Sequence, residues 1–225
     1  MGTVTLNKNN RLYWLGRYAE RVYQDVESIK TILDKSIDGE ASGDLDILCK
    51  KIGVPNDFSS VEDFCSRFCF DRKIPESVLY SADAMLGNGM VLREVIGTQT
   101  LSYIQMAVIA IESAHESEAP GVPLQWALDD IMAFRGCYSE FVASQTVRNI
   151  IKSGASVERI GAMIRLGNKG EKLDYEIKKL VDRLKKSKLD HVKEYLEVIE
   201  KYARKEEGSD NEWLLLKAVE SLFIV

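Results

Sequence analysis

Apolar residues recur at alternating steps of three and four between Leu12 and Leu33. This spacing lines them up on one face of an α-helix, whereas a half-buried β-strand requires alternation with a period of two. We therefore predict a helix of roughly eight turns over about residues 10–37, ended by Asp38-Gly39. The residues of this apolar face are Leu12, Leu15, Ala19, Val22, Val26, Ile29 and Leu33.

The rest of the chain has the same helical periodicity, and no stretch alternates β-branched or aromatic residues with polar ones over the length of a strand. The sequence PGVP at residues 120–123 is the clearest break, and SG at residues 153–154 is predicted to end a second long helix. A capping-box pattern at residues 209–212 predicts the start of the last helix. The sequence therefore indicates one all-α domain over residues 1–225, a multi-helix up-down bundle. Further long helices are predicted at about residues 126–151, 157–184, 189–206 and 212–223.

Composition limits the functions that are open to such a bundle. The 30 Lys and Arg residues are outnumbered by 35 Asp and Glu residues, which argues against a general nucleic-acid binder. Residues 169–188 form a basic stretch, which we interpret as a solvated helix face, although nucleic acid or an acidic partner would also fit it. The longest apolar run, residues 106–111, is too short to span a membrane, and the N-terminus lacks the apolar core of a secretory signal. We expect a cytoplasmic protein with reduced thiols.

A short internal sequence repeat suggests that the bundle has two related halves. The pattern Leu-Gly-x-x-x-Glu-basic occurs at residues 15–21 and again at residues 166–172, each time inside a predicted long helix. A glycine in a helix interior costs about 1 kcal/mol relative to alanine, so such glycines suggest close packing. We therefore expect two pseudo-symmetric halves whose motif helices, at about residues 10–37 and 157–184, cross near Gly16, Gly167 and Gly170.

A polar stripe lies beside the apolar face of the first helix. Its members include Tyr13, Arg17 and Glu20, and Arg21 follows directly. A carboxylate close to a helix crossing must be paired, because an isolated buried charge costs several kcal/mol. Two interpretations are open at this point. The stripe forms structural ion pairs that lock the helices together, or it forms one wall of a polar pocket with Glu171 and Lys172 on the opposite wall.

The first motif also carries a family resemblance. Residues 10–21 read NRLYWLGRYAER, which resembles the opening motif of the bacterial alpha-E domain family. Residues 71–94 are similar to the central segment of that family, and this resemblance adds Asn88, Arg93 and Glu94 to the candidate polar residues. The chain departs from the family pattern where GNGM at residues 87–90 keeps only the asparagine of Glu-Asn-Ala-Arg. Asn168 likewise stands where arginine is expected, and Leu101 lies near an expected tryptophan.

The resemblance implies a modest function. Genes of the family lie beside ATP-grasp ligase-like and transglutaminase-like proteins, so we expect a non-catalytic accessory or binding protein for a peptide- or amide-ligating system. The alternative is an enzyme that acts on an amide or amino-acid substrate, with Arg17, Glu20, Arg21 and Glu171 as its acid–base cluster. A solvent-reachable cleft with a carboxyl of raised pKa would favour the enzyme, and closed ion pairs would favour the scaffold.

Two further possibilities follow from local patterns. Glu112 and His115 have the Glu-x-x-His spacing of ferritin-like metal bundles, with Glu20 and Glu171 as additional candidate ligands. The second Glu-x-x-His is missing, because His191 follows Lys188 at that spacing, so we expect no metal. No phosphate-binding loop or dinucleotide motif is present, and we expect no cofactor. The apolar run Trp213, Leu214, Leu215 and Leu216 exceeds one helix face and suggests a homodimer.

Overall fold

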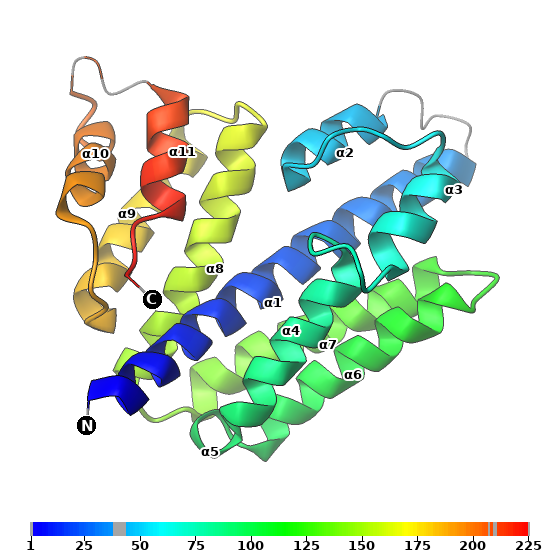
Figure 1. Cartoon of the computed structure of the whole chain (residues 1–225), viewed down its shortest axis with the longest axis horizontal. Coiled ribbons are helices and arrows are strands. Elements are labelled where there is room, and N and C mark those ends of the chain that lie inside the picture. Colours follow the sequence, from blue (N-terminus) through cyan, green and yellow to red (C-terminus); the bar gives the residue numbers. More distant parts are fainter. Residues whose placement is uncertain (1, 38–43, 207, 209–210, 225) are drawn as a thin grey trace. The chain divides into compact units, whose positions relative to one another are not determined.

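In the computed structural model the described residues are 2–37, 44–206, 208 and 211–224. Within these ranges the chain forms eleven α-helices and one π-helical turn, with no strand or sheet, which confirms the all-α prediction (Figure 1). The helices are α1 (Gly2–Ile37), α2 (Asp44–Ile52), α3 (Val61–Phe64), α4 (Val78–Val91), α5 (Arg93–Ile96), α6 (Thr98–His115), α7 (Gly121–Phe141), α8 (Gln145–Arg165), α9 (Glu171–Ser187), α10 (Lys193–Ala203) and α11 (Glu212–Glu220), and the π-helical turn η1 covers Cys65–Cys69.

The chain divides into two compact units that share the long helix α1. The terminal unit comprises Met1–Arg17 and Ser144–Val225, and the central unit comprises Tyr18–Ala143. The first half of α1 therefore belongs to the terminal unit and the second half to the central unit. The predicted pseudo-symmetry between halves stays a prediction.

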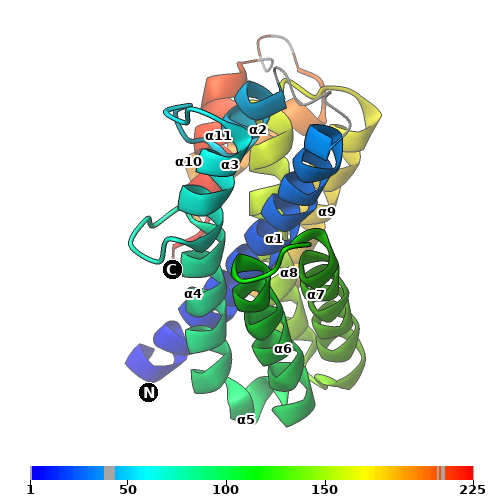
Figure 2. The same ribbon diagram turned by 90° about the vertical axis from the view of Figure 1, so that its right-hand side faces the viewer.

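The core of the central unit is built around a helical hairpin. Helices α6 and α7 pack along each other, and α4 packs on the other side of α6 (Figure 2). Ser77 caps α4 by accepting a hydrogen bond from the backbone N–H of Tyr80, and Ser60 caps α3 in the same way through Asp63. These caps satisfy helix-start N–H groups, so the short helices begin where the sequence places a hydroxyl.

The terminal unit contains a second hairpin, formed by α8 and α9. Helix α11 packs on α8, and α10 packs on α11 and α9. An isolated antiparallel bridge joins His191 to Phe223, and it ties the end of the described chain to the connection between α9 and α10. Phe223 also contacts Tyr13 of α1, with ring centroids 5.2 Å apart.

Several predicted helix boundaries are wrong. The first helix begins at Gly2 and not near residue 10. The predicted helix over 157–184 is two helices, α8 and α9, because Gly167 (φ 71°) and Gly170 (φ 94°) lie in the connection between them. A positive φ favours glycine and ends an α-helix. The predicted helix over 126–151 is also divided, since α7 ends at Phe141 and α8 begins at Gln145. The expected break at residues 153–154 lies instead inside α8.

The predicted start of the last helix is only partly observable. Asn211 caps α11 by accepting a hydrogen bond from the N–H of Leu214, while Ser209 and Asp210 lie outside the described residues. The predicted end of the first helix at Asp38-Gly39 also lies outside them. None of the helices in the described part of the chain combines the length and the apolarity that a membrane span requires.

Candidate functional site

Helices α1 and α8 touch at their backbones. A Cβ added to Gly16 would overlap the backbone of Ile151, and one added to Gly154 would overlap the backbone of Tyr13. Each glycine therefore meets the residue three positions before the other glycine, so the contact is reciprocal. The sequence analysis predicted that Gly16 lies at a close helix crossing, and the structure confirms this. The crossing helix is α8 near Gly154, however, and the predicted crossing with the later motif at Gly167 is wrong.

The signal that was missed is a second copy of the first motif. Gly16 begins the pattern Gly-x-x-x-Glu-Arg, which ends at Glu20-Arg21, and Gly154 begins the same pattern, which ends at Glu158-Arg159. Both glycines lie at the crossing. A search for Gly-x-x-x-Glu-Arg, with arginine in place of any basic residue, finds this second copy on α8.

The glutamate of the second copy forms an ion pair with the first helix. Arg17 Nε lies 2.7 Å from Glu158 Oε1, and both side chains are almost wholly buried. The guanidinium also lies over the ring of Trp14, 4.8 Å from its centroid. Burial raises the pKa of the neighbouring Tyr13 to about 12, with the charge of Arg17 acting in the opposite direction. This part of the stripe is therefore closed to water by α8.

Arg159 of the second copy forms an ion pair with Glu176 of α9, also within the terminal unit. Its Nη1 donates to Glu176 Oε2 at 3.1 Å, and Lys179 Nζ donates to the other carboxylate oxygen at 2.8 Å. Burial raises the pKa of Glu176, but the hydrogen bond from Lys179 and the charge of Arg159 outweigh it, so the pKa lies below its usual value. Helices α8 and α9 are thus joined by a charged pair on a largely apolar interface.

The glutamate of the first copy pairs in the central unit. Glu20 is only 3% exposed, and its Oε2 accepts a hydrogen bond from Arg135 Nη2 of α7 at 2.8 Å. Gln24 Nε2 donates to the other oxygen of Glu20 at 3.0 Å. Arg135 also lies over the ring of Tyr23, 4.2 Å from its centroid, and donates to the sulfur of Met132. Glu20 therefore fixes an arginine that contacts two further side chains.

The other residues predicted to line a pocket with Glu20 are more exposed. Glu171 and Lys172 lie in the first turn of α9, and both are exposed. Arg21 lies over the ring of Tyr18, 5.6 Å from its centroid. Because Glu20 belongs to the central unit and Glu171 to the terminal unit, a shared pocket stays a prediction.

The residues suggested by the central segment lie on or beside α4 and α5. Asn88 is half-buried on α4, and Glu94 is exposed on α5. Arg93 is exposed and donates from Nε to Thr98 Oγ1 at 3.3 Å. Arg93 and Glu94 are therefore surface residues of the central unit.

The candidate metal ligands have other partners. Glu112 accepts from Arg72, which also pairs with Asp83 at 2.7 Å. His115 is exposed, with its ring 4.6 Å from the ring of Phe70. In the described residues no group of three or more His, Cys, Asp or Glu side chains gathers in a way that would hold a metal ion.

The apolar run of the last helix is divided between surface and core. Trp213 and Leu214 are exposed, whereas Leu215 is buried and Leu216 is half-buried. Lys217 Nζ lies 5.3 Å from the centroid of the Trp213 ring. The homodimer stays a prediction.

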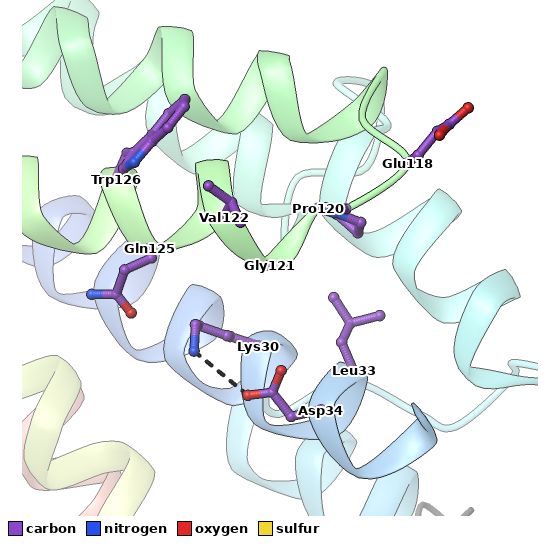
Figure 3. Close-up of a pocket in the computed structure, with 10 residues that line it drawn as sticks. Lys30, Leu33, Asp34, Glu118, Pro120, Gly121, Val122, Gln125 and Trp126 are labelled. Atoms are coloured by element: carbon purple, nitrogen blue, oxygen red, sulfur yellow. Dashed lines mark hydrogen bonds and ion pairs between the residues drawn. The ribbon is translucent and has the colours of Figure 1, made fainter. Parts of the chain in front are cut away.

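A groove runs between α1 and α7 on the surface of the central unit. One cavity of about 660 Å³ is lined from α1 by Lys30, Leu33 and Asp34 and from α7 by residues including Val122, Gln125 and Trp126 (Figure 3). A second cavity of about 280 Å³ shares Lys30, Asp34 and Gln125 with the first. Tyr23 and Met132, the two neighbours of Arg135, line the second cavity. The groove was not predicted from the sequence.

A family model described as a predicted alpha-helical domain with a conserved ER motif, named Alpha-E, matches residues 9–219. The chain belongs to the Alpha-E family. No curated protein and no solved structure matches the chain. The two Glu-Arg pairs of this Alpha-E protein are Glu20-Arg21 and Glu158-Arg159. Both glutamates form buried ion pairs, Glu20 with Arg135 and Glu158 with Arg17.

Proposed function

We propose that this Alpha-E protein is a non-catalytic binding protein whose binding surface is the groove between α1 and α7. The observation that supports this proposal is the closure of the Glu-Arg ion pairs. Glu20 and Glu158 are buried and hydrogen-bonded to arginine, whereas a general acid or base must come within hydrogen-bond reach of a substrate. The burial and pairing of these two carboxylates therefore favour a structural role over the alternative of a Glu/Arg catalytic cluster.

The ion pair of Glu20 has a structural task that suits a binding protein. Glu20 orients Arg135, and Arg135 contacts Tyr23 and Met132, which line the groove. A fixed arginine behind two lining residues limits the rotamers that those residues adopt, and a preorganised surface loses less entropy on binding. The Glu-Arg motif thereby contributes to the shape of the groove without contacting the ligand.

The partner that we propose is an ATP-grasp ligase-like protein. This part of the proposal rests on the family resemblance, in which alpha-E genes lie beside ATP-grasp and transglutaminase-like genes. An accessory protein needs a preformed surface and no nucleotide site of its own. The groove supplies such a surface, since it combines exposed apolar side chains with charged ones.

The test is affinity purification of the tagged full chain from the cells that encode it, with mass spectrometry of the retained proteins. We expect an ATP-grasp protein with the wild type and with the Trp213→Ala control, and its loss with Trp126→Ala. Retention that is unchanged in Trp126→Ala would exclude the groove as the binding surface. Amide ligation or hydrolysis by the purified chain alone, lost in a folded Glu20→Gln variant, would overturn the non-catalytic role.

A further inference from the structure

The floor of the groove is apolar and open to solvent. Val122 and Met132 are each 52% exposed and Trp126 is 57% exposed, all on α7. Leu33 of α1 lines the same groove and is half-buried. Large apolar side chains grouped on a helix face are typical of a surface that a partner covers. Such an arrangement fits the apolar face of another helix.

The rim of the groove is acidic. Lys30 is the only base among the residues that line the two described cavities, and it lies 3.5 Å from Asp34 in a surface ion pair. The next base along α1, Lys35, pairs with Asp44. The rim therefore carries an excess of negative charge beside an exposed tryptophan, and a tryptophan face attracts cations. The exposed acids of the rim are Glu27, Asp34, Glu118 and Asp129.

The length of the groove sets the size of its ligand. Its lining residues on α1 extend from Tyr23 to Asp34, which is roughly 16 Å along a helix axis and about three helical turns. On α7 they extend from Val122 to Met132, a similar length. Two neighbouring helices that line a groove over a similar length form the kind of surface into which a third amphipathic helix packs.

We infer that the groove between α1 and α7 binds a cationic amphipathic helix of a partner protein. Apolar side chains of that helix contact Trp126, Val122 and Leu33, and its lysines or arginines face the acidic rim. This inference rests on the proposed binding function and specifies the partner segment. Charge complementarity distinguishes this helix from an acidic one, because the rim repels like charge.

The probe is a fluorescein-labelled peptide of leucine and lysine, about 14 residues long, with leucines along one helical face. Its control has glutamate at every lysine position and the same leucines. Binding is measured by fluorescence anisotropy with the full chain at low and at high salt. We expect the lysine peptide to bind at least about tenfold more tightly than the glutamate peptide, with the difference shrinking as salt screens the rim.

Substitutions in the groove locate the binding site. Trp126→Ala should lower the affinity for the lysine peptide by about tenfold or more, as expected for a central aromatic contact. Asp34→Asn and Asp129→Asn should each weaken it by about two- to fivefold. Glu140→Gln on the exposed part of α7 and Trp213→Ala on α11 are matched controls that should leave affinity unchanged. All five side chains are exposed, or carry only surface contacts, so the variants should fold.

Several outcomes would overturn the inference. Equal affinity for the two peptides would show apolar adhesion without selection for a cationic helix, and unchanged binding by Trp126→Ala would place the site elsewhere. Self-association of the chain in sedimentation that is lost in Trp126→Ala would identify a second copy as the occupant. No binding of either peptide, in a chain that still retains an ATP-grasp protein, would remove the cationic helix and leave the proposed function standing. Peptide binding without retention of an ATP-grasp protein would support the cationic helix and exclude the proposed ATP-grasp partner.

Discussion

Gly16 lies against the backbone carbonyl of Ile151 so closely that no Cβ fits between them. We predict that Gly16→Ala lowers the free energy of unfolding by about 1–3 kcal/mol, because the added methyl forces α1 and α8 apart. The loss outweighs the roughly 1 kcal/mol by which alanine is favoured over glycine in a helix. Thermal denaturation followed by circular dichroism measures the change, and Gly154→Ala should behave alike.

A matched glycine separates packing from helix propensity. Gly136 lies in α7 and is exposed, and a Cβ there would meet nothing within 4 Å. Gly136→Ala should therefore raise the free energy of unfolding by about 0.5–1 kcal/mol. If Gly16→Ala and Gly136→Ala shifted the melting temperature in the same direction by similar amounts, the backbone contact of α1 with α8 would be refuted.

Arg135→Met should destabilise the central unit through Glu20. The substitution leaves the buried carboxylate without its arginine partner, and we expect a loss of about 2–3 kcal/mol in the free energy of unfolding. This value is below that for a fully buried pair, since 21% of the Arg135 side chain is exposed. Urea denaturation measures it.

A double-mutant cycle assigns that loss to the pair. Glu20→Gln combined with Arg135→Met should be more stable than the sum of the two single losses predicts. Additive losses would indicate that Arg135 acts through Tyr23 and Met132 alone.

The two thiols at the ends of η1 should react at different rates. A hydrogen bond with Cys69 lowers the pKa of Cys65, with partial burial acting against it, whereas complete burial raises the pKa of Cys69. Since the thiolate is the nucleophile, iodoacetamide should modify Cys65 first in the native protein. Peptide mass spectrometry over time measures both rates.

Removal of the Cys69 thiol provides the control. In Cys69→Ala the pKa of Cys65 should rise and its alkylation should slow. Equal rates for Cys65 and Cys69 in the native wild type would contradict the assignment.

Tyr13 should make the folded protein sensitive to alkaline pH. Burial raises its pKa from 10.0 to about 12, so the folded state holds this proton more tightly than the unfolded state. The associated stability is complete below pH 10.0 and is lost as the pH rises toward about 12. Urea denaturation at neutral and at alkaline pH should show a smaller alkaline loss for Tyr13→Phe than for the wild type. Identical losses would show that Tyr13 ionises alike in both states.

The helical class was predictable because periodicity reports burial directly. From Leu12 to Ile29 every residue of the predicted apolar face is buried, and Leu33 at its end is half-buried. The division between α7 and α8 contains no glycine, but glycine was the source of the errors at residues 153–154 and 167–170, because it serves two opposite purposes. Gly154 permits close contact inside a helix, whereas Gly167 adopts a positive φ and lies outside one. Neither purpose is visible in the neighbouring residues alone.

The partners in the candidate site depended on tertiary structure. Spacing along the first helix indicated that Glu20 needs a cation, but Arg135 lies on α7, far away in the sequence. The groove was even harder to predict from the sequence, because its two walls come from α1 and α7 and neither wall shows an unusual sequence pattern by itself. Sequence periodicity predicts faces of helices, and only the fold decides which faces meet.

The reciprocal contact of Gly16 and Gly154 has a genetic consequence. What stands opposite each glycine is main chain, which every amino acid possesses. A larger residue at either position therefore cannot be rescued by trimming a neighbouring side chain on the opposite helix. Selection for intragenic suppressors of Gly16→Ala should yield reversion or general stabilisers, and no allele-specific substitution at Ile151.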